Sequence, residues 1–261
     1  MIDAHIHLDL YEPEERDQLL TSLKLHGVKG LVADSMNLES CRNLLNLKKH
    51  SNHPIFAAFG FHPEQALPDK EEVDELFRWI RENQGEMTAI GEVGLPYYSR
   101  TAAETSGERF DIEPYVLLLE QFVKLAAELG KPIVLHAVYE DAEIVCDLLE
   151  KHGVKRAHFH WFKGSVETLR RMKGKGYTIS ITPDIVYKER TKSLVEFYPL
   201  NLLMVETDGP WPFQGPFEGR RTHPSMIRDS IREISVIKKI SVEEAGRILF
   251  ENTIRFYNML L

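Results

Sequence analysis

The sequence contains few cysteines and no long hydrophobic segment. Only Cys41 and Cys146 occur among 261 residues, too few for a disulfide-stapled scaffold. Cys146 lies in a helical pattern, where a free thiol usually serves as a small buried apolar residue. No apolar run approaches the roughly 18 residues that a membrane span requires. We therefore expect neither a disulfide framework nor a membrane-spanning protein.

We also expect no signal peptide at the N-terminus. The first residues, Met1 to His5, already have the pattern of a strand, which leaves no room for the basic and apolar regions of a secretory signal. Together with the absence of an apolar span, this predicts a cytoplasmic protein that needs no membrane and no obligate protein partner.

The chain has no overall excess of positive charge. Its formal net charge is −8, which disfavours diffuse nucleic-acid binding because such binding depends on phosphate neutralisation by Lys and Arg. Between residues 163 and 192, however, eight basic residues stand against three acidic ones, and Arg220 and Arg221 form a later pair. A local basic rim is one interpretation, and ordinary solvated helix faces are the other.

Short strand patterns alternate with amphipathic segments of helical length. We expect strands at 1–6, 28–34, 54–59, 87–93, 132–136, 156–160, 177–181 and 202–207. Several are continuous apolar runs, typical of strands buried on both faces. Eight such units predict an α/β fold, a (β/α)8 TIM barrel that is at most slightly distorted, as a single domain over residues 1–261. A seven-stranded variant is the alternative.

The helices between these strands have recognisable ends. The clearest spans 114–129, and Gly130 follows it as a C-cap residue. Ser165 and Asp141 precede two other helical patterns and are expected to cap them.

Two connections are longer than a barrel requires, at 94–112 and 209–224. Both follow the C-terminal end of a strand, where loops usually carry substrate contacts. The second contains Trp211, Phe213, Phe217, Arg220 and Arg221. This composition favours a lid that stacks on a ligand and binds anions, with a packed surface loop as the alternative.

Histidines and carboxylates recur at the predicted strand ends. They are His5, His7, Glu92, His136, His160 and Asp208. The C-terminal ends of barrel strands converge on one face, and imidazoles and carboxylates that meet there can bind a divalent cation. The conjunction predicts a metal site, although each position alone is weak evidence.

The first strand presents two histidines on one side. His5 and His7 are two residues apart, so their side chains share a face of the strand. Asp3 has the same parity and lies deeper, where it could orient a ligating imidazole. His-x-His alone is a weak signal.

The other predicted ligands have competing interpretations. A carboxylate at Glu92, which closes an apolar strand, is costly to bury unless a cation or a hydrogen-bond network compensates; a buried salt bridge is the alternative. His158 has the parity of His160 and is its rival. We prefer His160 because it lies nearer the strand end, and we interpret His158 as a hydrogen-bonded core residue.

Two further residues have predicted roles in chemistry. A carboxylate at Asp208 can bind metal, orient a water and accept its proton, and Glu206, of the same parity, could support it. His62 follows the third strand, where it could contact substrate or protonate a leaving group. A structural turn histidine is the alternative.

Seven stretches in this order resemble the TatD-type metal-dependent deoxyribonucleases over essentially the whole chain. They are Asp3-Ala4-His5-Ile6-His7-Leu8, Gly60-Phe61-His62-Pro63, Gly91-Glu92-Val93-Gly94-Leu95, Lys131-Pro132-Ile133-Val134-Leu135-His136, His160-Trp161-Phe162-Lys163-Gly164-Ser165, Glu206-Thr207-Asp208-Gly209-Pro210 and Glu251-Asn252-Thr253. The resemblance implies two sets of ligands. His5, His7, Glu92 and Asp208 would hold one ion, and Glu92, His136 and His160 a second, with Glu92 bridging.

Three positions depart from the pattern of that family. Pro96 stands where an Asp is common, Ala137-Val138 where Ser-Arg is common, and the segment before Pro224 lacks the usual Asn and acidic residue. The metal-ligand set is intact, whereas these positions face the expected substrate.

The leading hypothesis is a deoxyribonuclease with two divalent ions, with Asp208, Glu92 and His62 in catalysis and His62, Lys163 and Arg221 as substrate contacts. Imidazoles suit Zn or Mn, and the resemblance implies activity with Mg or Mn. One rival is a hydrolase of esters, amides or lactones, for example an aminoacyl-tRNA deacylase. The other is a non-enzymatic binding protein on the same barrel.

Overall fold

Eight parallel strands follow one another around the sheet in chain order. The computed structural model describes residues 1–260. The strands are β1 (Ile2–Ile6), β2 (Gly30–Asp34), β3 (Ile55–Phe59), β4 (Met87–Gly94), β5 (Ile133–His136), β6 (Ala157–Phe159), β7 (Thr178–Ile181) and β8 (Leu203–Val205). The predicted (β/α)8 barrel is confirmed, and it has eight strands rather than seven.

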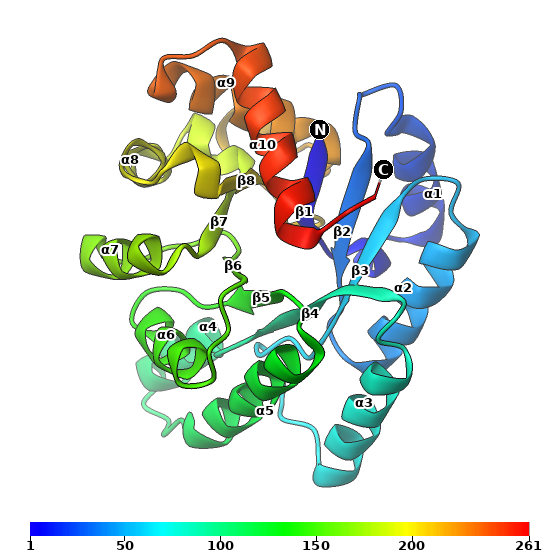
Figure 1. Cartoon of the computed structure of the whole chain (residues 1–261), viewed down its shortest axis with the longest axis vertical. Coiled ribbons are helices and arrows are strands. Elements are labelled where there is room, and N and C mark those ends of the chain that lie inside the picture. Colours follow the sequence, from blue (N-terminus) through cyan, green and yellow to red (C-terminus); the bar gives the residue numbers. More distant parts are fainter. Residues whose placement is uncertain (261) are drawn as a thin grey trace.

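Helices surround the strands, as Figure 1 shows from blue α1 to red α10. They are α1 (Pro13–Ser22), α2 (Leu38–His50), α3 (Lys70–Glu82), α4 (Tyr97–Thr105), α5 (Glu113–Leu129), α6 (Asp141–Lys151), α7 (Val166–Lys175), α8 (Glu189–Phe197), α9 (Ile227–Lys238) and α10 (Val242–Tyr257). Among residues 1–260, no helix is both long and apolar enough to cross a membrane.

Local sequence signals account for several helix ends. Gly130 adopts φ 62° and ends α5, as predicted, because glycine has no Cβ to oppose a left-handed conformation. The Ser165 side chain accepts a hydrogen bond from Thr168 N and caps α7, also as predicted. The predicted cap at Asp141 was wrong: α6 begins at this residue, and its carboxylate instead lies 2.6 Å from Arg100 Nη2 on α4.

Apolar residues fill both sides of the sheet. One set lies between the strands and the surrounding helices and includes Leu31, Phe59, Leu135 and Phe159. A second set consists of strand residues that face the other way, such as Val32, Val134 and Met204. These side chains pack together with residues of α10. This explains the continuous apolar strand runs, because a barrel strand is buried on both faces.

The barrel closes between β1 and β8 through a few specific bonds. Asp208 N donates to His5 O at 3.0 Å, and His7 N donates to Gly209 O at 2.8 Å. The Asp3 carboxylate accepts hydrogen bonds from the backbone N–H and the hydroxyl of Thr207. The prediction that Asp3 orients an imidazole was therefore wrong, because Thr207 occupies both of its oxygens. These bonds fix His5 and His7 beside Asp208.

The two long connections differ from their prediction in part. The segment 94–112 contains α4. In the segment 209–224, the Trp211 side chain is 48% exposed, but Phe213 and Phe217 are buried together with Met226. The expected stacking role for these two phenylalanines was wrong, because they form the small core that supports the loop.

Candidate metal centre

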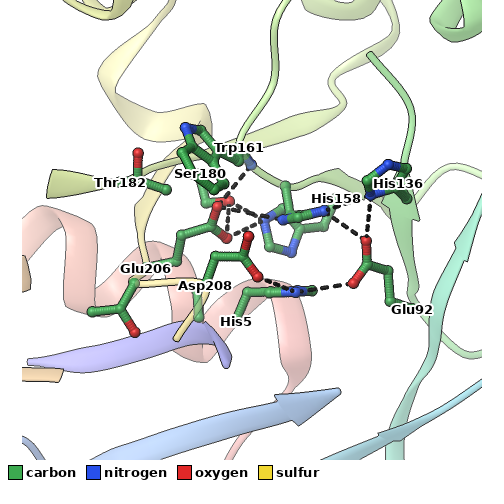
Figure 2. A network of polar contacts seen from close by, with 12 residues as sticks. His5, Glu92, His136, His158, Trp161, Ser180, Thr182, Glu206 and Asp208 are labelled. Atoms are coloured by element: carbon green, nitrogen blue, oxygen red, sulfur yellow. Dashed lines mark hydrogen bonds and ion pairs between the residues drawn. The ribbon is translucent and has the colours of Figure 1, made fainter. Parts of the chain in front are cut away.

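The six predicted ligand side chains meet at the C-terminal end of the barrel. His5 belongs to β1, Glu92 to β4 and His136 to β5, while Asp208 follows β8. All six residues, including His7 and His160, are buried. Figure 2 shows the Glu92 carboxylate with one oxygen toward His5 and the other toward His136.

The first group surrounds Glu92 Oε2 and Asp208 Oδ1. Glu92 Oε2 lies 3.1 Å from His5 Nε2 and 3.2 Å from His7 Nε2. Asp208 Oδ1 lies 3.4 Å and 3.5 Å from the same two nitrogens, which are 3.4 Å from each other. The two carboxylate oxygens thus face the same pair of imidazole nitrogens.

The second group surrounds Glu92 Oε1. This oxygen lies 2.8 Å from His136 Nδ1, 2.7 Å from His160 Nε2 and 3.5 Å from His62 Nε2. His136 Nδ1 and His160 Nε2 are 3.4 Å apart. Glu92 therefore joins the two groups, with one oxygen in each.

The donor atoms of the first group fit a cation. Glu92 Oε2 and Asp208 Oδ1 are buried and make no hydrogen bond within residues 1–260. Ligands about 2.0–2.1 Å from a tetrahedral ion lie roughly 3.3–3.4 Å apart. The separations between the two imidazole nitrogens and the two carboxylate oxygens, 3.1–3.5 Å, are close to this value. Two imidazole nitrogens that face each other with two carboxylate oxygens form the donor set of a divalent metal.

The four histidines predicted as ligands present their other ring nitrogen to an oxygen. His5 Nδ1 lies 3.2 Å from Asp34 Oδ2, and His7 Nδ1 lies 3.1 Å from the Asp34 carbonyl oxygen. His160 Nδ1 lies 3.6 Å from Glu206 Oε1. His136 Nε2 lies 3.3 Å from Glu64 Oε1. Such outer oxygens fix the tautomer and the orientation of ligating imidazoles.

Sequence reasoning missed Asp34 and Glu64. Asp34 ends the second predicted strand, so the rule that found Glu92 and Asp208 would also have found it. Glu64 lies beyond Pro63 in a loop, and nothing in the local pattern indicates that it reaches β5.

Electrostatics favour ionised carboxylates at the centre. Burial alone would raise the pKa of Glu92, but His160 and His5 hold it well below its usual range. Burial likewise opposes ionisation of Asp208, yet His5 and His160 lower its pKa. For Asp34, burial outweighs the opposing charge of His5 and raises the pKa to about 7. Glu92 and Asp208 are therefore negative, as cation ligands must be.

His62 joins the second group as a neutral imidazole. Burial lowers its pKa to about 3. Glu64 N donates to His62 Nδ1, so Nε2 carries the proton and points toward Glu92 Oε1. A simple turn histidine would not be aimed at the centre in this way.

His158 lies outside both groups. Its Nδ1 contacts Tyr257 Oη at 2.7 Å and its Nε2 contacts Ser180 Oγ. Ser180 in turn donates to Glu206, whose other oxygen accepts from Trp161 N (Figure 2). His158 is a hydrogen-bonded core residue, and Glu206 supports the segment that carries His160.

A cavity of about 500 Å³ opens over the centre. Its walls include Val138 and the aromatic rings of Tyr98, Trp161 and Trp211. Lys163 Nζ projects between two of these rings, 4.3 Å from the Trp161 ring centroid, and donates to Tyr98 Oη at 2.5 Å. Within residues 1–260, Tyr98 Oη is the polar partner of Lys163 Nζ, and no carboxylate forms an ion pair with it.

Arg221 lies outside this cavity. Its Nε lies 2.7 Å from Glu15 Oε1, and its guanidinium covers the Tyr11 ring. It belongs instead to a neighbouring groove with Arg220, Thr222 and His223.

Comparisons with known proteins agree with this geometry. The family model described as TatD related DNase matches residues 2–258. An uncharacterized metal-dependent hydrolase of Haemophilus influenzae is 38% identical over 259 residues, which cover 99% of this chain and 100% of that protein. The human deoxyribonuclease TATDN3 is 28% identical, with 100% of this chain and 95% of that protein covered.

A solved structure shares the fold. The crystal structure of YjjV, a TatD homologue from Escherichia coli, matches with a TM-score of 0.84 and 24% identity, over 100% of this chain and 98% of that one. At this identity the likeness concerns the fold.

Proposed function

The chain belongs to the TatD related DNase family of metal-dependent hydrolases, and from this premise we propose that it is a deoxyribonuclease that hydrolyses phosphodiester bonds with two divalent ions. The name of the human relative, a deoxyribonuclease, supports the substrate class.

One observation carries the proposal: the two oxygens of Glu92 face two separate groups of donor atoms. Oε2 faces His5 and His7, and Oε1 faces His136 and His160. A carboxylate shared in this way would hold both ions if each group bound one. Zn, Mn and Mg are the candidate ions, because the four imidazoles favour the first two and the oxygens accept the third.

Bound ions would supply Lewis acidity that activates a water and offsets the charge of the scissile phosphate. The chain's own residues supply the remaining functions. Asp208 is ionised and lies at the mouth of the first group, where its carboxylate orients the attacking water and accepts its proton. His62 donates from Nε2–H to an oxygen of the substrate or of the leaving group.

The cavity supports an anionic substrate beside the centre. The Lys163 ammonium has no carboxylate partner within residues 1–260, and an unpaired cation in a partly buried site favours an anion. The aromatic walls suit a nucleobase, since base–aromatic stacking contributes about 1–3 kcal/mol per base. Arg221 would contact only a longer strand that extends beyond the cavity.

An ester, amide or lactone hydrolase is the second candidate, and Val138 favours it. This residue brings an apolar surface to the cavity where the resemblance leads us to expect Arg. A small carbonyl substrate with one anionic group would match an apolar wall and a single lysine. A non-enzymatic binding role is disfavoured, because it would not require both groups of donor atoms.

DNA oligonucleotides labelled at either end test the proposal. Metal-stripped protein is incubated with single- and double-stranded DNA plus Mg²⁺, Mn²⁺ or Zn²⁺, with Glu92→Ala as the control. We expect metal-dependent cleavage by the wild type and none by the variant. The labelled end at which products accumulate shows the direction of cleavage along the strand.

Normal metal binding without cleavage of any DNA would reject the nuclease. A panel of aminoacyl esters, amides and lactones would then test the second candidate. Absence of metal binding by the wild-type protein would reject both hydrolases.

A further inference from the structure

Glu64 connects a predicted metal ligand to the wall of the cavity. It lies in the loop after β3, and its side chain is only 15% exposed. Oε1 lies 3.3 Å from His136 Nε2. The same carboxylate accepts hydrogen bonds from Tyr98 N and Ser99 N, both at 2.8 Å, and from Ser99 Oγ.

The contact with α4 replaces a missing cap. The residue before this helix is Pro96, whose side chain makes no capping hydrogen bond. The first backbone N–H groups of a helix have no partner within the helix, so a carboxylate from another segment satisfies them and interacts favourably with the helix dipole. Glu64 therefore fixes the first turn of α4, which carries Tyr98 into the cavity wall.

The contact with His136 has a chemical consequence. His136 Nδ1 points to Glu92 Oε1 at 2.8 Å. His136 Nε2 makes no hydrogen bond within residues 1–260, and Glu64 Oε1 is the carboxylate oxygen that faces it at 3.3 Å. A neutral imidazole carries one proton, and a carboxylate that faces Nε2 favours the tautomer with the proton on that nitrogen. The lone pair of Nδ1 is then free for a cation, and the ring cannot turn without breaking its contact with Glu64.

We propose that Glu64 is a positioning residue for the second ion, holding His136 in the orientation and tautomer in which Nδ1 faces Glu92. This inference rests on the two-ion site of the proposed function. It also implies that Glu64 holds in place both His136 and the part of the cavity wall formed by Tyr98, so that loss of Glu64 disturbs both.

Zn²⁺ titration against a chromophoric chelator tests the role without measuring activity. The proteins are wild type, Glu64→Ala, Glu64→Gln and Ser99→Ala, all stripped of metal. The wild type is expected to bind two ions. Glu64→Ala should weaken one of them by about 10- to 100-fold, as loss of an outer partner typically does, and leave the other unchanged.

Ser99→Ala is the matched control, because it removes one bond of the α4 cap and leaves the carboxylate at His136. Its two affinities should equal those of the wild type. Glu64→Gln, which keeps an acceptor of similar shape, should lose less than Glu64→Ala, and it serves as the test variant if circular dichroism shows that Glu64→Ala does not fold.

Long-range ¹H–¹⁵N spectra of the histidines add a signature that a purely structural cap would not change. At a Zn²⁺ concentration that fills both sites of the wild type, His136 should carry its proton on Nε2. In the folded Glu64 variant the second site is only partly filled at this concentration, so the Nε2–H tautomer should no longer be the single species. Unchanged affinities and tautomer would overturn the inference, as would an equal loss in Ser99→Ala. A wild type that binds fewer than two ions would instead reject the two-ion function, and the role of Glu64 with it.

Discussion

Asp34 Oδ2 lies 3.2 Å from His5 Nδ1, and both side chains are fully buried. The carbonyl oxygen of the same residue lies 3.1 Å from His7 Nδ1. One residue at the end of β2 thus faces both His5 in β1 and His7 just after it, and each imidazole is left with Nε2 directed at Glu92 and Asp208.

Replacement of Asp34 should therefore weaken the first ion. We expect Asp34→Ala to lower metal affinity by about 10- to 100-fold, because His5 loses the acceptor that fixes its ring. Asp34→Asn, which keeps an oxygen in place, should lose less metal affinity than Asp34→Ala. Competition with a chelator measures both, and equal affinities in all three proteins would contradict the role.

Replacement of Asp208 by Asn should lower the rate of the reaction without disturbing the fold. Asp208 adopts φ 50°, a left-handed conformation that Asn tolerates better than most residues. Asp208→Asn should keep the fold and lower kcat by about 10²- to 10⁴-fold, the range expected when a positioned base is removed. Thermal unfolding and steady-state kinetics check the two parts. Full activity in this variant would exclude Asp208 as the base.

A methyl group at Gly94 should strain the strand that carries Glu92. An added Cβ would lie 1.9 Å from His136 O, so β4 and β5 would have to separate. We expect Gly94→Ala to cost about 1–3 kcal/mol of unfolding free energy, as overpacking does.

Gly174→Ala is the control for this strain. Gly174 lies in α7 with no atom within 4 Å of an added Cβ, and alanine there should stabilise the helix by about 0.5–1 kcal/mol. Urea unfolding measures both changes. A Gly94→Ala protein as stable as the wild type would show that the two strands adjust without strain.

The sequence predicted the barrel because each strand carries its own signal. Runs such as Ile133-Val134-Leu135 are apolar on both faces, and Gly130 ends the helix before them, so the alternation of elements can be recognised without tertiary information. The convergence of His5, Glu92 and Asp208 follows from the barrel, since the C-terminal ends of its strands share one face.

The partners of these residues could not be predicted in the same way. The contact of Glu64 with His136 joins the loop after β3 to β5, and it depends on loop conformation rather than on periodicity. Arg221 was predicted as a substrate contact from its charge and its place in the connection 209–224, but its guanidinium pairs with Glu15 on α1. The two-residue spacing correctly placed Asp3 on the same side of the strand as His5. It could not predict that the Thr207 hydroxyl donates a hydrogen bond to the Asp3 carboxylate.

Removal of the Lys163 charge should weaken substrate binding. Lys163 Nζ lies between the Trp161 and Tyr98 rings, 4.3 Å and 5.1 Å from their centroids. A hydrogen bond to a charged group contributes about 1.5–3 kcal/mol, so Lys163→Met should raise KM for a DNA oligonucleotide by roughly 10- to 100-fold with little change in kcat. Lys155→Met, on an exposed lysine outside the cavity, should change neither. A fall in kcat alone would indicate a role in the chemical step instead.

The titration of His223 should make stability depend on pH. Burial, followed by the charge of His26, lowers its pKa to about 4. Its Nδ1 accepts a hydrogen bond from Ser225 N, and its Nε2 contacts Ser22 Oγ at 2.8 Å. Protonation of Nδ1 breaks the first of these bonds. The unfolded chain, with an ordinary histidine pKa near 6.5, therefore takes up this proton at a higher pH than the folded protein does.

Because the unfolded state binds more protons between about pH 6.5 and pH 4, the stability contributed by neutral His223 falls as the pH decreases through this window. His223→Asn keeps a side-chain acceptor for Ser225 N and does not titrate. Its free energy of unfolding should therefore decline less than that of the wild type from pH 7.5 to pH 4.5, as measured by urea unfolding of metal-free protein. Because both proteins share every other titrating group, their difference isolates His223, and parallel curves would show that this histidine does not couple to folding.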